Sequence, residues 1–330
     1  MVTSHTFDVP GMPVGYTVGR QSLDDTEAVL AVVHAYDIST LGYPDFASSD
    51  VVDVYNGSHT DPERDTWVVR DDSGTVCAWA FIASNYGDDK DDLDVYSTPG
   101  IDAGVRPALV GAIVGRVADR AVDRGLSEVL ATGYAVVGDD AWAAVLLDYG
   151  FKVSRRFSRM RIDFDGPRPF PVPPTGVTVR VFRPTVERDW SDWHRVLVDS
   201  FAEHWGSAEM TLAAFRARID AEQDPNFAEW FFADLDGVPV GICQSTGSFK
   251  EQNAGWVRNL GVLPVYRGRG IARFLLEHAF ATYTARGCTW AGLGVDTQNE
   301  TGALGLYESV GLYPVFQADA YQRSIPAADT

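Results

Sequence analysis

Apolar and polar positions follow the same order of patterns twice along the chain. Residues 66–70 and 76–83 are apolar or alternating runs on either side of the turn-forming sequence 71–74, which predicts a β-hairpin. Residues 229–233 and 238–245 repeat this arrangement around a second turn that contains Asp and Gly. Each half of the chain is therefore expected to contain an antiparallel hairpin at the same place.

Apolar residues with helical spacing lie before and after the second hairpin in the sequence. Apolar residues recur every three or four positions before it and after it, as on the buried face of an amphipathic helix. Gly287 and Gly311 stand where two of these helices would end, since glycine readily adopts the left-handed conformation that follows a helix. The predicted elements are helices at 191–201, 211–222, 271–286 and 300–310, strands at 255–262 and 289–295, and a final pair of strands.

An internal duplication relates the two series. Residues of the same type recur 161 to 163 positions apart in five pairs: Arg20 and Arg183, Trp67 and Trp230, Gly74 and Gly237, Gly125 and Gly287, and Gly150 and Gly311. Between the halves, five prolines in residues 166–175 remove backbone donors and fix φ, so this segment can continue neither a helix nor a central strand. We therefore predict two similar domains, at residues 1–165 and 176–330, joined by a stiff linker at 166–175.

The composition is that of a globular protein without a membrane span. Of the 330 residues, 45% are hydrophobic and 12% aromatic, and no apolar run approaches the eighteen or so residues of a transmembrane helix. The N-terminus lacks the basic and apolar regions of a signal peptide, so a cytoplasmic location is expected. Cys77, Cys243 and Cys288 are far apart in apolar sequence, which favours buried free thiols over disulfides or a metal site.

The formal net charge of −19 narrows the range of partners. It would repel the phosphates of nucleic acid, so no nucleic-acid partner is expected, whereas a cationic small molecule would be attracted. A solvated acidic surface is the simpler alternative explanation of the charge. Monomer and homodimer are both compatible with this composition.

The most informative local motif is residues 267–270, Arg-Gly-Arg-Gly, at the start of a predicted helix. The glycines let a backbone approach a ligand, the arginines supply positive charge, and the helix points free N–H groups at the same place. These properties suit a pyrophosphate. A P-loop is excluded because Ile271 and Ala272 replace its Lys-Ser or Lys-Thr, and a Rossmann turn is excluded because Arg273 replaces its third glycine or alanine.

This turn resembles the coenzyme-binding signature of the GNAT N-acetyltransferases, Gln/Arg-x-x-Gly-x-Gly/Ala. Residues 295–312 resemble the second GNAT signature, an Asn followed by a helix that ends in Leu-Tyr-Glu-x-x-Gly-Phe. The order and spacing of the two motifs agree with the family, so the resemblance covers residues 176–326. It implies acetyl-CoA as the acyl donor and no metal. The implied coenzyme contacts are Leu260, Gly261, Val262, Arg267, Gly268, Arg269, Gly270, Ile271, Ala272 and Asn299.

The resemblance also implies a fold and a division of roles. The family has an α/β fold in which a mixed, mostly antiparallel sheet is flanked by helices, and here this fold would occur twice in tandem. The second copy carries both signatures. In the first copy, Leu146 aligns with Tyr307 and Gly138 with Asn299, and residues 101–106 replace the glycine turn with a sequence whose aspartate would oppose a pyrophosphate. We therefore expect the first domain to be a degenerate, non-catalytic copy.

Acetyl transfer from a thioester to an amine requires a neutral amine, donors for the developing oxyanion and a proton for the departing thiolate. By resemblance, the strand 259–262 separates from its neighbour, and the Val262 N–H is the oxyanion donor. Tyr307 is the implied general acid, since a phenol with a pKa near 10 is protonated at neutral pH. A core aromatic residue is the alternative role for Tyr307. Asn299 would hold the coenzyme or Tyr307, and helix capping is its simpler role.

The proton acceptor is where the sequence departs from the family pattern. Many relatives carry a Glu early on the strand before the glycine turn, whereas residues 254–258 contain no carboxylate. Glu203 is the first candidate for the base and His204 the second, since an imidazole pKa near 6.5 suits proton transfer. A solvated helix end is the alternative for both. The aromatic residues expected to form the amine pocket, unless they are core residues, are Trp205, Trp256 and Phe249.

The sequence thus predicts an N-acetyltransferase that acts on a primary amine of a small molecule, with the second domain active. Two alternatives stay open. Some tandem members of the family acetylate an aminosugar-linked cysteine, although the missing strand carboxylate favours an unassigned small amine. The other alternative is a protein that binds acyl-CoA without turnover.

Overall fold

The computed structural model describes residues 6–57, 60–84, 89–202, 210–220, 222, 225–298 and 302–328. The chain forms two compact units. Unit 1 comprises Met1–Arg156 and Phe316–Thr330, and unit 2 comprises Phe157–Val315. The division therefore differs from the contiguous domains predicted from the sequence, because the end of the chain belongs to unit 1.

In unit 1, the strand order is β1-β2-β3-β4-β5-β12. Neighbouring strands are antiparallel except for β4 and β5, which are parallel, and the predicted hairpin of β2 and β3 is confirmed. The bounds are β1 (Tyr16–Gly19), β2 (Thr66–Asp71), β3 (Val76–Ala83), β4 (Lys90–Ser97), β5 (Glu128–Val136) and β12 (Tyr313–Pro326).

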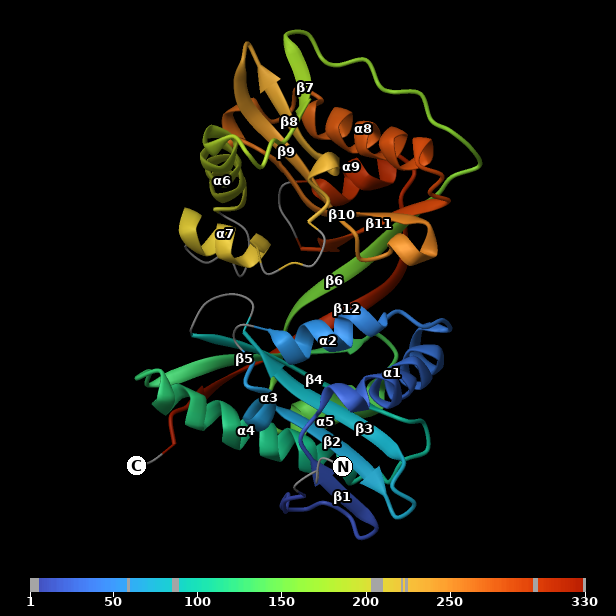
Figure 1. Cartoon of the computed structure of the whole chain (residues 1–330), viewed down its shortest axis with the longest axis vertical. Coiled ribbons are helices and arrows are strands. Elements are labelled where there is room, and N and C mark those ends of the chain that lie inside the picture. The colour runs from blue at the N-terminus through green and yellow to red at the C-terminus, as the bar shows by residue number, and fades with distance from the viewer. Residues whose placement is uncertain are drawn as a thin grey trace. The chain divides into compact units, whose positions relative to one another are not determined.

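Helices cover both faces of this sheet (Figure 1). Valines of α1 (Thr26–Leu41) and α2 (Ser48–Asn56) pack on one face around Trp79, which is fully buried. On the other face, α4 (Val105–Asp123) and α5 (Asp140–Asp148) bury leucine, isoleucine and valine side chains against β2 to β5. The short helices η1 (Leu23–Asp25) and α3 (Pro62–Asp65) lie in the connections.

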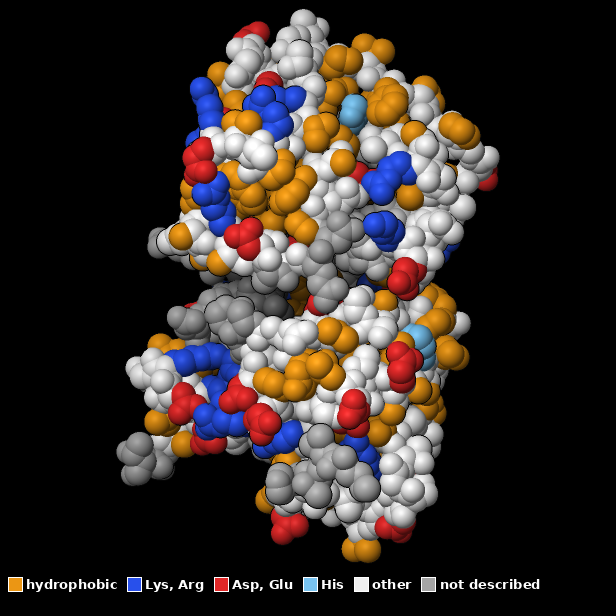
Figure 2. All heavy atoms as spheres, viewed as in Figure 1, with side chains coloured by type: hydrophobic (Ala, Val, Ile, Leu, Met, Phe, Trp, Pro, Cys, Tyr) orange, Lys and Arg blue, Asp and Glu red, His pale blue; other side chains and the backbone are white. Residues whose placement is uncertain are grey.

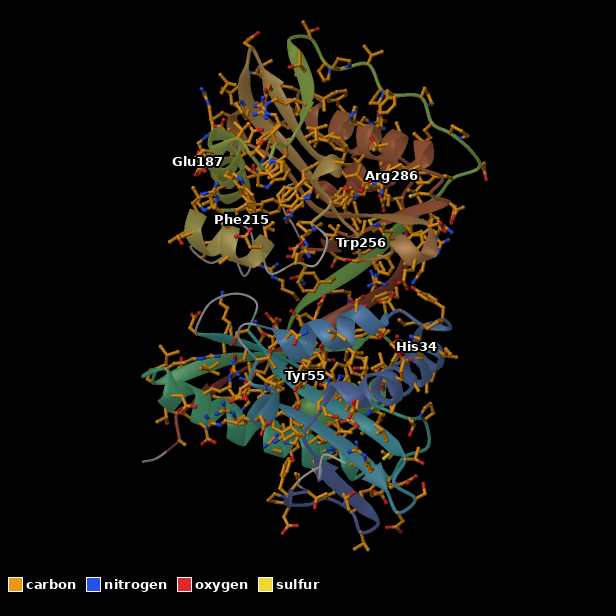
Figure 3. The ribbon with its side chains drawn as sticks, viewed as in Figure 1. His34, Tyr55, Glu187, Phe215, Trp256 and Arg286 are labelled. Carbon is orange, nitrogen blue, oxygen red and sulfur yellow. The ribbon has the colours of Figure 1, made fainter. Side chains whose placement is uncertain are left out.

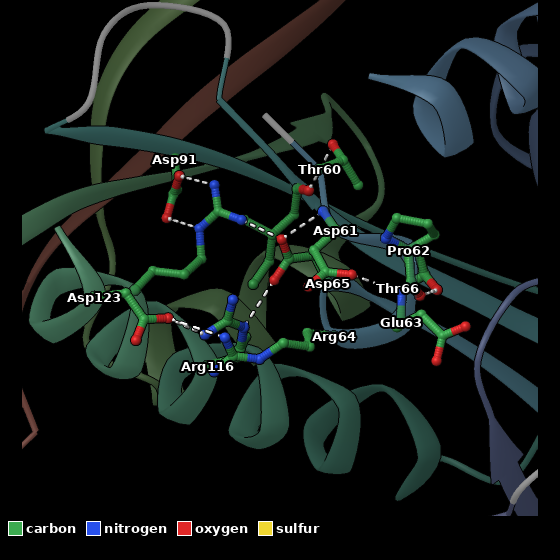
Figure 4. A network of polar contacts seen from close by, with 12 residues as sticks. Thr60, Asp61, Pro62, Glu63, Arg64, Asp65, Thr66, Asp91, Arg116 and Asp123 are labelled. Carbon is green, nitrogen blue, oxygen red and sulfur yellow. Dashed lines mark hydrogen bonds and ion pairs between the residues drawn. The ribbon is translucent and has the colours of Figure 1, made fainter. Parts of the chain in front are cut away.

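A buried ion network joins α4 to the sheet of unit 1 (Figure 4). Arg120 is 5% exposed, and its guanidinium contacts both Asp65 and Asp91, each of which is 1% exposed. Arg116 adds a bond of 2.7 Å to Asp65, and Arg124 one of 3.0 Å to Asp91. Because each carboxylate meets more than one guanidinium, both buried charges are compensated.

Unit 2 repeats the architecture, with strand order β6-β11-β10-β9-β8-β7. Only β10 and β11 are parallel among the pairs recorded for its described strands, and the second predicted hairpin, β8 and β9, is confirmed. The bounds are β6 (Lys152–Asp163), β7 (Val177–Val181), β8 (Trp230–Leu235), β9 (Val238–Thr246), β10 (Ala254–Val262) and β11 (Trp290–Asp296).

The helices of unit 2 again form two layers. One core, rich in tryptophan and phenylalanine, lies under α6 (Glu187–Phe201) and α7 (Leu212–Asp220). The other lies under α8 (Ile271–Ala285) and α9 (Ala303–Ser309), two helices that the sequence predicted within a few residues. Single 3-10 turns occur at η2 (Phe227–Glu229), η3 (Lys250–Gln252) and η4 (Pro264–Tyr266).

The two halves of the sequence exchange a strand. The last strand, β12, pairs with β5 through Ala318–Pro326 in unit 1, and β6 pairs with β11 through Phe157–Asp163 in unit 2. The predicted final strand pair is therefore wrong: residues 313–326 form one strand, because no glycine interrupts them to reverse the chain. The proline-rich segment 166–175 is irregular, as expected, but it connects β6 to β7 within unit 2 instead of joining two domains.

Candidate active site

The glycine turn before α8 is open. Gly268 and Gly270 both have φ of +77°, a left-handed conformation that glycine adopts without strain. A Cβ built on Gly268 meets nothing within 4 Å, and one on Gly270 meets only Pro174 Cγ at 3.9 Å. Gly270 is the N-cap of α8 and supplies no side-chain hydrogen bond, so the first N–H groups of the helix are uncapped. The turn has the properties of an anion site.

Arg267 fixes this turn to the rest of unit 2. Its Nε donates to the Val262 carbonyl over 3.2 Å, and its Nη2 donates to the Ser200 carbonyl over 3.0 Å. The guanidinium therefore bridges the end of β10 and the end of α6. Arg269 lies over the ring of Tyr266, with its guanidinium carbon 5.5 Å from the ring centroid. Arg267 is thus tied to β10 and α6, and Arg269 lies against Tyr266.

The strand before the turn separates from its parallel neighbour. The ladder between β10 and β11 runs from Ala254 to Val257, while β10 stays paired with β9 as far as Val262. The Leu263 N–H donates to Val240 of β9 over 2.9 Å. Since N–H groups alternate along a strand, those of Val262 and Leu260 point to the opposite side, toward the gap. The separation expected at residues 259–262 is present, and it leaves backbone donors directed at it.

Helix α6 ends directly above this gap. A Cβ on Gly261 would lie 2.9 Å from Ser200 Cβ and 3.1 Å from the ring of Phe201, so only glycine permits the contact. Ser200 Oγ is buried and has no hydrogen-bond partner among the described residues. Gln244 Nε2 is likewise unpaired, although Gln244 Oε1 accepts from Asn259 Nδ2 over 2.6 Å. Unused polar groups beside a gap are suited to a polar substrate.

Tyr307 lies on the other face of the sheet, on α9. It is 8% exposed, and burial raises the pKa of its phenol to about 12, with a smaller contribution from the neighbouring Cys243. Cys243 is the register partner of Leu260 on β10, which places Tyr307 near the separated part of that strand. A protonated phenol at this position can donate a proton over the whole neutral range.

The candidate residues that follow α6 in the sequence lie outside the described residues. These are Glu203, His204 and Trp205, and Asn299 is outside them as well. The structure brings a different carboxylate to the gap: Glu222 pairs with Arg258, which follows the last rung of the β10–β11 ladder. No sequence motif pointed to this pair, because its two members are 36 residues apart.

The other two predicted pocket residues do lie together. The ring centroids of Phe249 and Trp256 are 5.0 Å apart, and that of Trp290 is 5.4 Å from that of Phe249; of the three, Trp256 is labelled in Figure 3. Arg159 covers both members of the first pair, at 5.3 and 5.1 Å from their ring centroids. A Cβ on Gly292 would lie only 2.7 Å from the Trp256 ring. The aromatic cluster is therefore packed against the sheet and capped by a cation.

Basic and acidic side chains are interspersed on the face shown in Figure 2. Within the described residues, no helix is long and apolar enough to cross a membrane, and no group of His, Cys, Asp and Glu is arranged to hold a metal ion. All three cysteines are free thiols; Cys77 and Cys243 are buried, as predicted, whereas Cys288 is half-buried. Burial raises the pKa of Cys243 to about 12.

Comparison of the sequence with known proteins points to the same family as the two motifs. Residues 190–312 match the sequence model of the acetyltransferase (GNAT) family, which confirms the resemblance. A mycothiol acetyltransferase of Thermobispora bispora is 34% identical over 198 residues, and one of Salinispora arenicola is 33% identical over 193 residues. The matches cover 56% and 55% of this chain, which spans 65% and 59% of the length of these relatives.

Two solved structures share the fold over nearly the whole chain. A GCN5-related N-acetyltransferase from Sphaerobacter thermophilus matches 97% of this chain and 99% of its own, with a TM-score of 0.80 and 22% identity. A tandem GNAT protein from the clavulanic acid biosynthesis pathway matches 95% of this chain and 100% of its own, with a TM-score of 0.72 and 15% identity. The predicted fold class, a tandem of GNAT-like mixed sheets flanked by helices, is confirmed.

Proposed function

We propose that this chain, which carries the GNAT acetyltransferase match at residues 190–312, transfers the acetyl group of acetyl-CoA to a primary amine of a small molecule. One observation supports this most strongly. In unit 2, an open and uncapped glycine turn follows a strand that has separated from its parallel neighbour. The turn offers N–H groups and positive charge to phosphates, and the strand offers backbone donors to the thioester end.

The coenzyme would lie along β10, with its pyrophosphate at the turn. There the N–H groups from Gly268 to Ala272 and the charges of Arg267 and Arg269 would hold the phosphates. The N–H groups of Leu260 and Val262 would bind carbonyl oxygens of the pantetheine arm and of the thioester. Because their direction is fixed by the β9–β10 ladder, these donors need no rearrangement to stabilise the oxyanion.

The reaction would proceed by direct attack of the amine. The nitrogen lone pair adds to the thioester carbonyl, and the carbonyl oxygen takes the negative charge, stabilised by the Val262 N–H. The carbon–sulfur bond then breaks. Tyr307 gives its proton to the departing sulfur, and the amine nitrogen loses a proton to a base. The high pKa that burial gives Tyr307 keeps its proton available for this step.

We propose that the base lies in the segment that follows α6 in the sequence. Ser200 and Phe201, the last residues of α6, lie against Gly261, so the chain leaves the helix beside the gap. Glu203 comes three residues after Ser200, and we propose it as the proton acceptor, directly or through water, with His204 as the second candidate. Glu222 is engaged by Arg258 and is the described carboxylate that a test should exclude.

The acceptor is a small amine from the cytoplasm, and its cationic form would be attracted by the net charge of −19. Two relatives are named mycothiol acetyltransferases, so the mycothiol precursor is a second candidate acceptor. Against it stands Arg258, a cation at the position where a strand carboxylate would serve an amine. An acyl-CoA-binding protein without turnover is the remaining alternative.

A thiol-release assay with acetyl-CoA tests the proposal. The full chain is assayed with aminosugars, polyamines, aminoacyl compounds and an aminosugar-linked cysteine. Turnover on an amine, reduced in Tyr307→Phe and in Glu203→Gln but retained in Glu222→Gln, supports the proposed roles. Loss of activity in His204→Gln but not in Glu203→Gln would transfer the role of base to His204. Binding of acetyl-CoA with no turnover on any amine would favour the non-enzymatic alternative.

A further inference from the structure

Unit 1 contains a hollow that the proposed reaction does not use. Its volume is about 390 Å³, within the range of small-molecule sites. The hollow lies between the C-terminal part of α1, the first turn of α4 and the loop that precedes α5. Its walls include Tyr36, Thr40, Arg106, Gly138, Asp139 and Ala141, all of which belong to unit 1.

Two opposite charges in the walls are held rigidly. The Arg106 side chain is 17% exposed; its Nε donates to Ser97 Oγ over 2.9 Å, and its guanidinium carbon lies 4.9 Å from the centroid of the Tyr36 ring. Asp139 Oδ2 accepts from the Tyr36 hydroxyl over 2.8 Å, and Asp139 Oδ1 accepts from the Trp142 N–H over 3.1 Å. Neither side chain can move far without losing these partners.

The two charges are only loosely paired with each other. Arg106 Nη1 and Asp139 Oδ2 are 3.5 Å apart, at the long end of the range for a hydrogen bond. The Nη2 group of Arg106 has no acceptor among the described residues, and Arg106 lines the hollow. The hollow therefore presents a guanidinium with unused donors next to a carboxylate.

We propose that this hollow binds a zwitterion, an α-amino acid with a small side chain. A lone anion would be opposed by Asp139, and a lone cation by Arg106, whereas a ligand with both charges meets an opposite charge at each end. The planar guanidinium can bind the ligand carboxylate with two parallel hydrogen bonds, and Asp139 can accept from the ammonium group.

The remaining walls fit such a ligand. Gly138 has φ of +106°, and a Cβ on it would meet nothing within 4 Å, so the backbone of the loop leaves room beside the two charges. Burial raises the pKa of Tyr36, so its phenol is neutral and adds no third charge. Val137 and Ala141 present small apolar side chains, which suits a short aliphatic group on the ligand.

The hollow occupies a meaningful place in the duplicated fold. Gly138 aligns in sequence with Asn299, and α1, α4 and the loop before α5 are the counterparts of α6, α8 and the loop before α9. The hollow thus includes the unit 1 counterpart of the start of α8. The proposal does not depend on the proposed reaction, because all of its residues are in unit 1.

Calorimetry on the full chain with three kinds of probe tests the charge argument without any variant. Glycine, L-alanine and L-serine carry both charges, acetate carries only the carboxylate, and ethylammonium carries only the cation. We expect one of the amino acids to bind, with acetate and ethylammonium at least about tenfold weaker. Binding of acetate as tight as that of the amino acids would overturn the proposal, as would absence of amino-acid binding up to about 10 mM.

Variants then locate the site. Ala141→Leu fills the hollow without removing a charge, and Arg106→Gln removes the guanidinium; each should weaken amino-acid binding at least about tenfold. Asp139→Asn preserves the cap of α5 and tests the ammonium contact. Arg188→Gln is the matched control, since the Arg188 side chain is 83% exposed in unit 2. The affinity of this variant for the amino acid should be unchanged. Affinity retained in both Ala141→Leu and Arg106→Gln, with folding verified by circular dichroism, would contradict the assignment.

Discussion

The first turn of the long helix is built differently in the two units. In unit 2, a Cβ on Gly268 would meet only open space, and Gly270 leaves the start of α8 uncapped. In unit 1, Asp102 Oδ1 accepts from the Gly104 N–H over 2.8 Å, and a Cβ on Gly104 would lie 2.9 Å from Pro13. The chain's own carboxylate and proline thus fill the place that the open turn offers to a phosphate. We therefore expect an anion to bind at this turn in unit 2 and not in unit 1.

The strand position after the parallel ladder also differs in charge between the two units. The parallel ladder ends at Leu93 in β4 and at Val257 in β10. The next residue is Asp94 in unit 1 and Arg258 in unit 2. Unit 1 therefore keeps a carboxylate at the strand position where unit 2 lacks one, but without an open glycine turn beside it. Neither unit has both an open glycine turn and a strand carboxylate. The base of unit 2 is therefore proposed to lie in the segment that follows α6.

The largest expected effect comes from closing the open turn. Gly270→Asp places a carboxylate in the turn, and we expect acetyl-CoA affinity to fall at least about 1,000-fold, about 4 kcal/mol, in calorimetry. Gly270→Asn is the matched control: it also tolerates a positive φ but adds no charge, so it should lose clearly less affinity. In unit 1, Asp102→Asn should leave the affinity unchanged. A Gly270→Asp affinity within tenfold of the wild type would contradict the assignment of the turn.

The ion pairs of the two units predict unequal losses of stability. Arg120→Met leaves Asp65 and Asp91 with less compensation inside unit 1, so we expect a loss of about 3–5 kcal/mol in the free energy of unfolding. In unit 2, Arg216 pairs with Glu187, whose side chain is 73% exposed, and Arg216→Met should lose only about 1 kcal/mol. Urea unfolding followed by fluorescence and circular dichroism measures both. Equal losses in the free energy of unfolding would show that the network in unit 1 stabilises the fold no more than the surface pair in unit 2 does.

Removing the proposed acid tests the chemistry of unit 2 alone. Tyr307→Phe should lower kcat about 100-fold, about 2.7 kcal/mol, with little change in acetyl-CoA affinity, because only the proton for the thiolate is lost. The control is Tyr321→Phe in unit 1, a tyrosine that is also buried and should keep full turnover. Steady-state kinetics with the best amine from the panel measures this. An unchanged kcat in Tyr307→Phe would show that Tyr307 is not the general acid.

The strand carboxylate of unit 1 predicts a smaller, pH-dependent effect. Burial, reinforced by neighbouring Asp92, raises the pKa of Asp94 to about 8. The folded state therefore holds the proton more tightly than the unfolded chain, so this group lowers stability as pH rises from about 4 to about 8. Asp94→Asn should become progressively more stable than the wild type over this range, by about 1–2 kcal/mol at the upper end, since the side chain is only partly buried.

The sign of this effect has a control in the same unit. Hydrogen bonds from Ser73 and Thr75 lower the pKa of Asp71, so Asp71 supports the folded state only when it is ionised. Asp71→Asn should therefore lose stability relative to the wild type as pH rises through the acid range. Denaturation midpoints measured from about pH 2 to about pH 9 compare the two variants. A constant difference between Asp94→Asn and the wild type would contradict the account of Asp94.

Local patterns in the sequence predicted much of this fold. Both hairpins, α8, β10 and β11 follow from periodicity and from turn residues within each element. Helix α6 begins at Glu187, earlier than the predicted residue 191, because its N-cap, Val186, gives no capping signal in the sequence. The strand exchange of β6 and β12 was not predictable, since the register of distant strands depends on tertiary packing and not on local pattern.

The site was predicted in part for the same reason. The glycine turn and Tyr307 lie in contiguous motifs, so the sequence could identify them as candidates. Two contacts of the site join segments that are distant in the sequence, and no spacing in the sequence predicts them. These contacts are Ser200 with Gly261 and Glu222 with Arg258. Phe249 and Trp256 were predicted as neighbours, but Arg159, which covers them, comes from β6 and could be placed only by the structure.

The stoichiometry of acetyl-CoA binding to the full chain tests the central contrast most directly. An open turn in unit 2 and a filled turn in unit 1 predict one coenzyme bound per chain in calorimetry, and none in Gly270→Asp. Two coenzymes per chain, or one that binds Gly270→Asp as tightly as the wild type, would contradict the account.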